Sequence, residues 1–192
     1  MTRRFAVSCM ILAFLFGACG GDDPDSAARR SASPTPAPTP CAIRDGSTDE
    51  QRSNAMPETA PLTDVRHSKE GCPRMVFEFS SHEPDYVVKY SEGPFSECGS
   101  GEPVSTDSWN ASAFLTVRLE PSATADLSQP DAPQTYDGPR DIEADGAVLK
   151  HLKVICDFEA VLEWVVGLDA RHDFTVFTLP DPARIVIDIS ET

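Results

Sequence analysis

The sequence predicts an all-β fold, a small β-sandwich or open barrel of about eight strands. Two observations lead to this prediction. From residue 61 onward, short runs of alternating apolar and polar residues follow one another, as in strands with one buried face. Pro, Gly, Asp and Ser interrupt these runs, and these residues favour turns. Residues 61–192 are sufficient for one domain with a modest core.

The first half of this domain shows the pattern in short segments. The run RMVFEFS at 74–80 is rich in β-favouring residues, and DYVVKY at 85–90 follows it. In AFLTVRL at 113–119, apolar and polar positions alternate. The strands predicted for this half are 65–67, 74–80, 85–90, 103–106 and 113–119.

The second half contains the clearest alternation, in FEAVLEWVVGL at 158–168. Helical spacing also fits this run, but its unbroken alternation and many β-favouring side chains favour a strand, with Trp164 in the core. Cys156-Asp157 is predicted as the turn that precedes it, and 122–142 as a long loop. The strands predicted for this half are 148–155, 158–168, 174–179 and 184–189.

The last predicted strand carries two opposite charges. Arg184 and Asp188 are four residues apart, so both lie on one face of the strand. We expect them to pair with each other or with neighbouring side chains, in a structural role.

Residues 1–18 are typical of a lipoprotein signal peptide that forms a helix. Two arginines precede the apolar run 5–16, which is too short to span a hydrocarbon layer of about 30 Å. The run ends in Phe16-Gly17-Ala18-Cys19, which resembles a bacterial lipobox. By that resemblance Cys19 is lipidated and becomes the mature N-terminus, and two acyl chains give stable attachment. An ordinary secretory signal, cut before Cys19, is the alternative.

Residues 19–60 are predicted to be a disordered tether, rich in Pro and Ser, which has nothing to bury. Four prolines alternate with small residues at 34–40, which favours an extended polyproline II segment of about 3.1 Å per residue. The predicted location is therefore the extracytoplasmic face of the cell membrane, with the domain spaced away from its lipid anchor.

Four cysteines follow the lipidation candidate. Exported domains of this size use disulfides, so we expect two bridges, in one of three pairings that the sequence leaves open. A zinc site is the alternative, but no CxxC or HxxxH spacing supports it. The disulfide candidates are Cys41, Cys72, Cys98 and Cys156.

The formal net charge of −15 argues against nucleic acid and anionic lipid headgroups as partners. The four histidines fall in no metal or catalytic motif, and no GxSxG sequence occurs. We therefore expect no enzyme, no metal site and no cofactor. Exposed aromatic side chains could bind a saccharide, and Trp109 and Tyr136 are the candidates, with a buried position of Trp109 as the alternative.

Four runs together resemble the AMIN-like domain of actinobacterial secreted lipoproteins, over about residues 62–190. They are RMVFEFS at 74–80, YVVKY at 86–90, the run 158–168, and FTVFTLPDPARIVIDI at 174–189. The last is similar to the signature F-x-V-x-x-L-x-x-P-x-R-[IV]-V-[IV]-D of AMIN domains. The resemblance implies a non-catalytic β-sandwich that binds a cell-envelope component such as peptidoglycan. Another envelope protein is the alternative partner.

Overall fold

A computed structural model of the chain describes residues 43, 46–53, 58–68 and 71–191. These residues form thirteen strands and no helix, so the all-β prediction is confirmed. Accordingly, no helix that could cross a membrane is found in the described part. The predicted signal helix, Cys19 and Cys41 lie outside the described residues.

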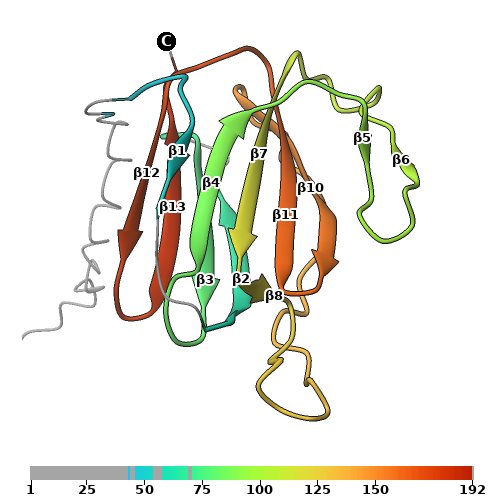
Figure 1. The fold of residues 1–192 in the computed structure, drawn as a ribbon. Helices are drawn as coiled ribbons and strands as arrows, with labels where there is room; N and C mark the ends of the chain where they lie inside the picture. Colours follow the sequence, from blue (N-terminus) through green and yellow to red (C-terminus); the bar gives the residue numbers. More distant parts are fainter. Residues whose placement is uncertain (1–42, 44–45, 54–57, 69–70, 192) are drawn as a thin grey trace, which may run out of the picture. The chain divides into compact units, whose positions relative to one another are not determined.

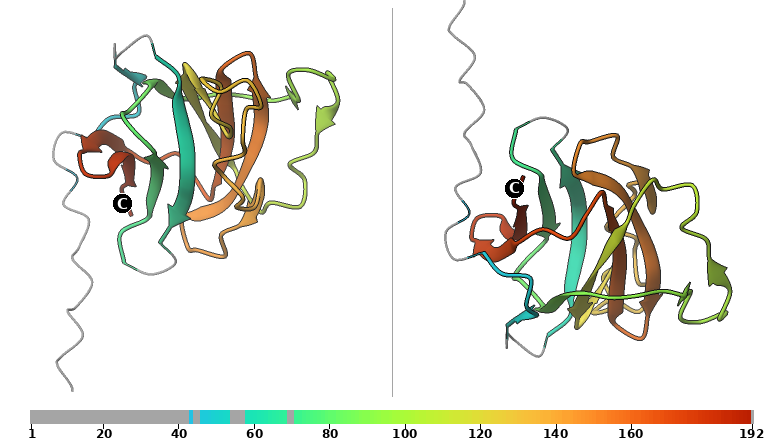
Figure 2. Two further views of the ribbon diagram at one scale, coloured as in Figure 1. Left: turned by 90° about the horizontal axis from the view of Figure 1, so that it is seen from below. Right: turned by 90° about the horizontal axis from the view of Figure 1, so that it is seen from above.

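Two open sheets pack face to face, and of the two predicted architectures the structure has the sandwich (Figures 1 and 2). In order, the front sheet contains β1 (Gln51–Arg52), β4 (Asp85–Tyr90), β7 (Ala113–Glu120), β11 (Val161–Leu168), β10 (Leu149–Phe158) and β9 (Asp141–Glu143). The back sheet contains β12 (Phe174–Leu179), β13 (Ala183–Ile189), β3 (Arg74–Phe79), β2 (Ala60–His67) and β8 (Ser122–Ala123). A separate hairpin of β5 (Phe95–Ser96) and β6 (Pro103–Val104) stands out from the front sheet.

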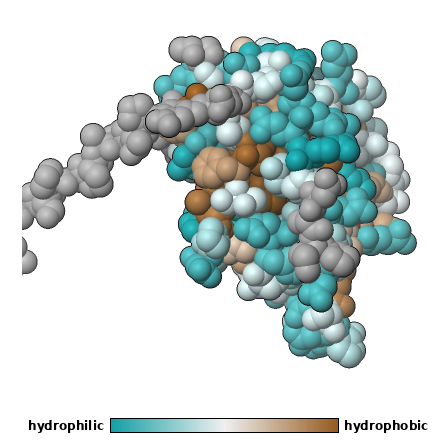
Figure 3. Space-filling view, turned by 60° about the vertical axis from the view of Figure 1, so that its left-hand side comes forward, coloured by the Kyte–Doolittle hydropathy of each residue, from teal (hydrophilic) through white to brown (hydrophobic). Residues whose placement is uncertain are grey.

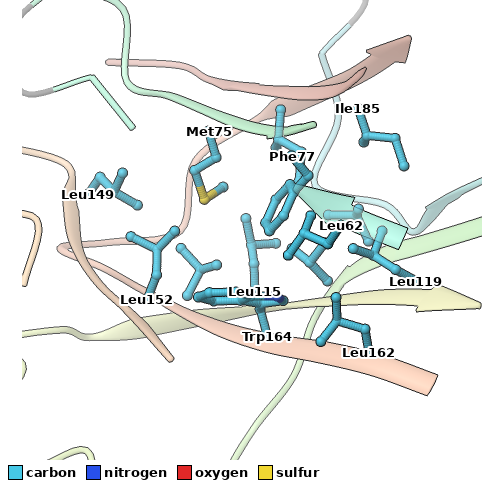
Figure 4. Packing of buried hydrophobic residues seen from close by; sticks show 14 of the residues in the cluster. Leu62, Met75, Phe77, Leu115, Leu119, Leu149, Leu152, Leu162, Trp164 and Ile185 are labelled. Atoms are coloured by element: carbon cyan, nitrogen blue, oxygen red, sulfur yellow. The ribbon is translucent and has the colours of Figure 1, made fainter. Parts of the chain in front are cut away.

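The core lies between the two sheets and is built from their inward-facing residues. Trp164 of β11 is fully buried, and its ring meets Phe77 of β3 edge-on at 5.8 Å between centroids. Figure 4 shows these two rings among the aliphatic side chains of both layers. The predicted core position of Trp164 is therefore confirmed.

The turn between β10 and β11 was predicted at the wrong place. Cys156 and Asp157 lie within β10, where they pair with Glu163 and Leu162. The chain instead turns at Glu159 and Ala160, with φ values of 50° and 60°. Turns with two positive φ values normally carry Asn or Gly, so neither residue marks this one in the sequence.

The predicted loop 122–142 is also more structured than expected. It contains β8 and the first residues of β9, and it inserts Tyr136 into the main core, where the side chain is 2 % exposed. The Tyr136 hydroxyl donates a hydrogen bond of 2.7 Å to the carbonyl of Pro139. This segment therefore closes one end of the sandwich.

Part of the predicted tether belongs to the folded domain. Ser47 pairs with Phe174 of β12, and Gln51 lies in β1, which pairs with β4. The Gln51 side-chain amide donates to the carbonyl of Phe174 at 2.7 Å and accepts from the amide of Val176 at 2.8 Å. A residue of the front sheet thus completes the edge of the back sheet.

The paired charges of the last strand have the structural role that we expected. Asp188, 7 % exposed, accepts two hydrogen bonds of 2.5 and 2.7 Å from Arg74 of β3. Arg184 donates to the carbonyls of Pro180 and Pro182. Both residues therefore pair with neighbours and not with each other.

The surface of the domain is mostly polar. Large apolar side chains are exposed at three positions in the described part, Leu127, Phe158 and Leu179. Figure 3 shows one face of the domain, with apolar areas near its middle among mostly hydrophilic residues. This distribution agrees with the acidic composition.

Burial makes the tyrosines resist ionisation and makes the stability of the fold depend on pH in alkali. Burial raises the pKa of Tyr136 from its ordinary 10.0 to about 12, and burial also raises the pKa values of Tyr86 and Tyr90. The pKa of Tyr136 is higher in the folded protein than in the unfolded protein. Protonated Tyr136 therefore contributes fully to the free energy of unfolding below pH 10.0, and this contribution is lost as the pH rises towards 12. We expect the tyrosinate absorbance at 295 nm to rise later in the folded protein than in guanidinium-unfolded protein. Coincident titration curves would contradict this prediction.

Candidate functional site

Residues 91–112, which connect β4 to β7 and contain β5 and β6, form an arm over the outer face of the front sheet. Phe95 and Trp109 of this arm pack on Val165 of β11 in a small second core. Phe114 of β7 contacts both rings edge-on, at 5.4 Å from Phe95 and 6.1 Å from Trp109. The arm is therefore fixed to the sheet at its base.

A disulfide between Cys98 and Cys156 holds the arm to β10. The Cys98 amide adds a hydrogen bond of 2.9 Å to the carbonyl of Ile155. This bridge confirms the disulfide prediction for two of the four candidates. Cys72 is disulfide-bonded as well, and the remaining candidate, Cys41, lies outside the described residues.

Three adjoining hollows of ≈ 440, ≈ 320 and ≈ 160 Å³ run along β10, and together we call them the β10 groove. The arm forms one wall, and β9 with the outward residues of β10 forms the floor. The first and second hollows share Glu97, Asp141 and Lys153. The second and third share Ser108, Trp109 and His151. The hollows therefore form one elongated, polar depression.

A stacked pair lies in the middle of the groove. The Trp109 ring lies 4.2 Å from the His151 ring at an angle of 10°, so the two are nearly parallel. His151 Nε2 is 2.5 Å from Asp141 Oδ1, and Lys153 Nζ donates to Asp141 Oδ2 at 2.9 Å. Stacking and hydrogen bonding together give these polar groups fixed positions before any ligand arrives.

Asp141 is held in its charged form. Partial burial of this carboxyl opposes ionisation, but the hydrogen bonds from Lys153 and His151 outweigh it and lower the pKa. A carboxylate at this position accepts hydrogen bonds from hydroxyl or amide groups of a ligand. Asp141 is therefore the anionic centre of the groove.

The end of the groove near the β10–β11 turn contains a second network. Asp157 accepts a hydrogen bond of 2.6 Å from Arg140 and another of 2.6 Å from the Thr124 hydroxyl. Phe158, which follows, is 58 % exposed and also lines this end. A charged network and an exposed aromatic ring therefore adjoin there.

The groove is rich in hydrogen-bonding groups. Its residues supply carboxylates, ammonium and guanidinium groups and serine hydroxyls, which form hydrogen bonds with polar ligands. No cluster of three or more His, Cys, Asp or Glu side chains that could hold a metal is found among the described residues. The groove therefore suits a long, polar, uncharged or mixed-charge ligand.

The two aromatic ligand candidates occupy different places. Trp109 is 5 % exposed, so the exposed position suggested by its polar neighbours is wrong, and the alternative of a buried anchor is what the structure shows. Its edge nevertheless lines two hollows of the groove. Tyr136 lies in the main core, away from the groove. Ligand contact by either residue stays a prediction.

Gly167 of β11 makes the position of Trp109 possible. A Cβ atom at Gly167 would lie 2.9 Å from Cβ of Ala111 and 3.1 Å from Cε3 of Trp109. A glycine inside a predicted strand was the one sequence signal of this close approach. Without it the arm could not pack as it does.

We therefore expect Gly167→Ala to displace the arm and lower the free energy of unfolding by about 1–3 kcal/mol. Tryptophan fluorescence should shift to the red as water reaches Trp109. Gly99→Ala is the control, because nothing lies within 4 Å of a Cβ at Gly99. Unchanged fluorescence and stability in Gly167→Ala would contradict the packing described for the arm.

Comparison with known protein families finds one match. The family model described as AMIN-like domain matches residues 60–191, which include both sheets and the arm. No curated protein and no solved structure matches the chain significantly.

Proposed function

Because the chain belongs to the AMIN-like domain family, we propose that it is a lipid-anchored envelope protein whose β10 groove binds peptidoglycan. The family suggests an envelope-related binding module. In this proposal Cys19 carries the lipid anchor at the extracytoplasmic face of the membrane, the tether gives the domain reach, and the domain holds the wall polymer without cleaving it.

The single observation that supports peptidoglycan glycan as the ligand is the continuity of the β10 groove. A glycan strand is linear and presents hydroxyl and acetamido groups along its length. Three hollows in a row, joined through Asp141, Lys153 and His151, offer donors and acceptors at successive positions. The edge of Trp109 between two hollows adds an apolar contact for a sugar ring.

Binding to purified cell wall tests this function. We expect wild-type protein without its signal peptide to co-sediment with wall, and also with glycan strands freed of their peptides by an amidase. The variant Lys153→Ala/Asp141→Asn should bind about tenfold more weakly, which corresponds to about 1.4 kcal/mol.

The matched control is Arg66→Ala/Asp64→Asn, which removes an ion pair of the same type from the back sheet. It should bind like wild type. Equal retention of the groove variant and wild type on the wall would show that the groove is not the binding site. No retention of wild type above an unrelated lipoprotein domain would refute wall binding altogether.

The alternative function, binding of another envelope protein, is favoured by Phe158. A phenylalanine that is 58 % exposed beside a charged network is typical of a protein contact. In-cell crosslinking from this position should then trap a protein partner, and Phe158→Ser should abolish the product. Crosslinking to wall polymer alone would exclude this alternative.

A further inference from the structure

A second cleft of ≈ 730 Å³ lies on the other side of the arm from the β10 groove. Its lining combines the two ends of the arm with the segment that follows β11, and it shares no residue with the three hollows of the groove. The cleft is lined by residues 90–93, 112–114 and 169–171.

Arg171 is held in place by an aromatic ring. Its guanidinium carbon lies 4.3 Å from the centre of the Tyr90 ring. The Tyr90 hydroxyl donates to the carbonyl of His172 at 2.7 Å and accepts from the His172 amide at 2.8 Å. Two hydrogen bonds therefore fix the hydroxyl end of Tyr90, and its ring positions the guanidinium at the cleft.

The charge of Arg171 is available to a ligand. No ion pair within the described part of the chain includes this residue, and its side chain is exposed. A guanidinium presents a planar set of donors that matches a carboxylate. A cation held over an aromatic ring in a cleft is therefore a suitable receptor for an anionic group.

The other lining residues limit the kinds of ligand that fit this cleft. Asp169, which pairs with His172 at 2.9 Å, and the exposed Glu92 place carboxylates in the same cleft. They disfavour a purely anionic ligand and favour one that also carries an ammonium group. Ala113, Ala170 and the ring of Phe114 offer small apolar walls between these charges.

We propose that this cleft is a binding site for a short zwitterionic peptide with small apolar side chains. Its terminal carboxylate binds Arg171, and its ammonium group lies towards Asp169 and Glu92. The site uses none of the groove residues, so the inference does not rest on the proposed function.

Titration of the isotope-labelled protein with tri-alanine, followed by NMR, tests the site. We expect shifts of the amide signals of residues 90–93, 112–114 and 169–171, with a dissociation constant of about 1 mM or below. The C-terminal amide and the N-acetyl form of tri-alanine should each bind at least about fivefold more weakly, because each lacks one charge.

Three variants make the test specific. Arg171→Gln should lose the binding, Arg171→Lys should retain part of it, and Lys153→Ala/Asp141→Asn should bind tri-alanine like wild type. Arg184→Gln is the control, since Arg184 likewise belongs to no ion pair in the described part and lies at the β12–β13 turn.

Several results would overturn the proposal. They are equal binding of tri-alanine and its amide, equal loss in Arg171→Gln and Arg184→Gln, and no shifts at the cleft. Shifts confined to the β10 groove would also overturn it. Because wall glycan is absent from this experiment, its failure leaves the groove proposal intact, and the reverse also holds.

Discussion

Replacing both Cys98 and Cys156 with alanine is expected to lower the free energy of unfolding by about 3–4 kcal/mol. The two cysteines are 58 residues apart in the sequence, so the bridge removes much chain freedom from the unfolded state. It also holds the arm, which otherwise rests on the small core of Phe95, Trp109 and Val165.

Urea denaturation followed by tryptophan fluorescence measures this loss, and hydrogen exchange at Cys98 and its neighbours reports whether the arm has come away from β10. Ser105→Ala, an exposed change on the same arm, is the control and should change little. A loss below about 1 kcal/mol would show that the arm is held by packing alone.

Arg74→Leu is expected to lower the free energy of unfolding by about 3 kcal/mol, at the lower end of the cost of removing one partner from a buried ion pair. The substitution leaves the Asp188 carboxylate, 7 % exposed, without its cation. The cost stays at this lower end because solvent reaches the Arg74 side chain, which is 44 % exposed.

Arg66→Leu is the matched control, since Arg66 pairs with Asp64 and Glu78 on the same face of the same sheet, and both carboxylates are more exposed than that of Asp188. Its loss should be below about 1 kcal/mol. The double variant Arg74→Leu/Asp188→Leu should recover most of the stability, because it removes the stranded charge. Equal losses for Arg74→Leu and Arg66→Leu would contradict this account.

The strands could be predicted from the sequence because alternation is a local property. The predicted strands 85–90 and 174–179 match β4 and β12 in the structure residue for residue. The turn at Glu159 and Ala160 could not be predicted, because its backbone conformation is imposed by the pairing of β10 with β11 and not by its own residues.

The candidate site depended on contacts that the sequence does not display. Trp109 stands in a polar stretch, and its burial depends on residues of distant strands, among them Val165 and the space left by Gly167. Tyr136 stands in a segment rich in proline, yet it fills the end of the core. The sequence allowed three pairings of the four cysteines. The choice of Cys98 with Cys156 required the fold.

The side-chain amide of Gln51 affects how copies of the domain can associate. An open strand edge invites pairing with a second copy and then aggregation, above all at the high local concentration that the proposed lipid anchor would create. Gln51 already occupies the carbonyl of Phe174 and the amide of Val176 on the edge of β12, and Pro180 follows the end of that strand. The occupied edge of β12 therefore disfavours strand pairing between copies of the domain.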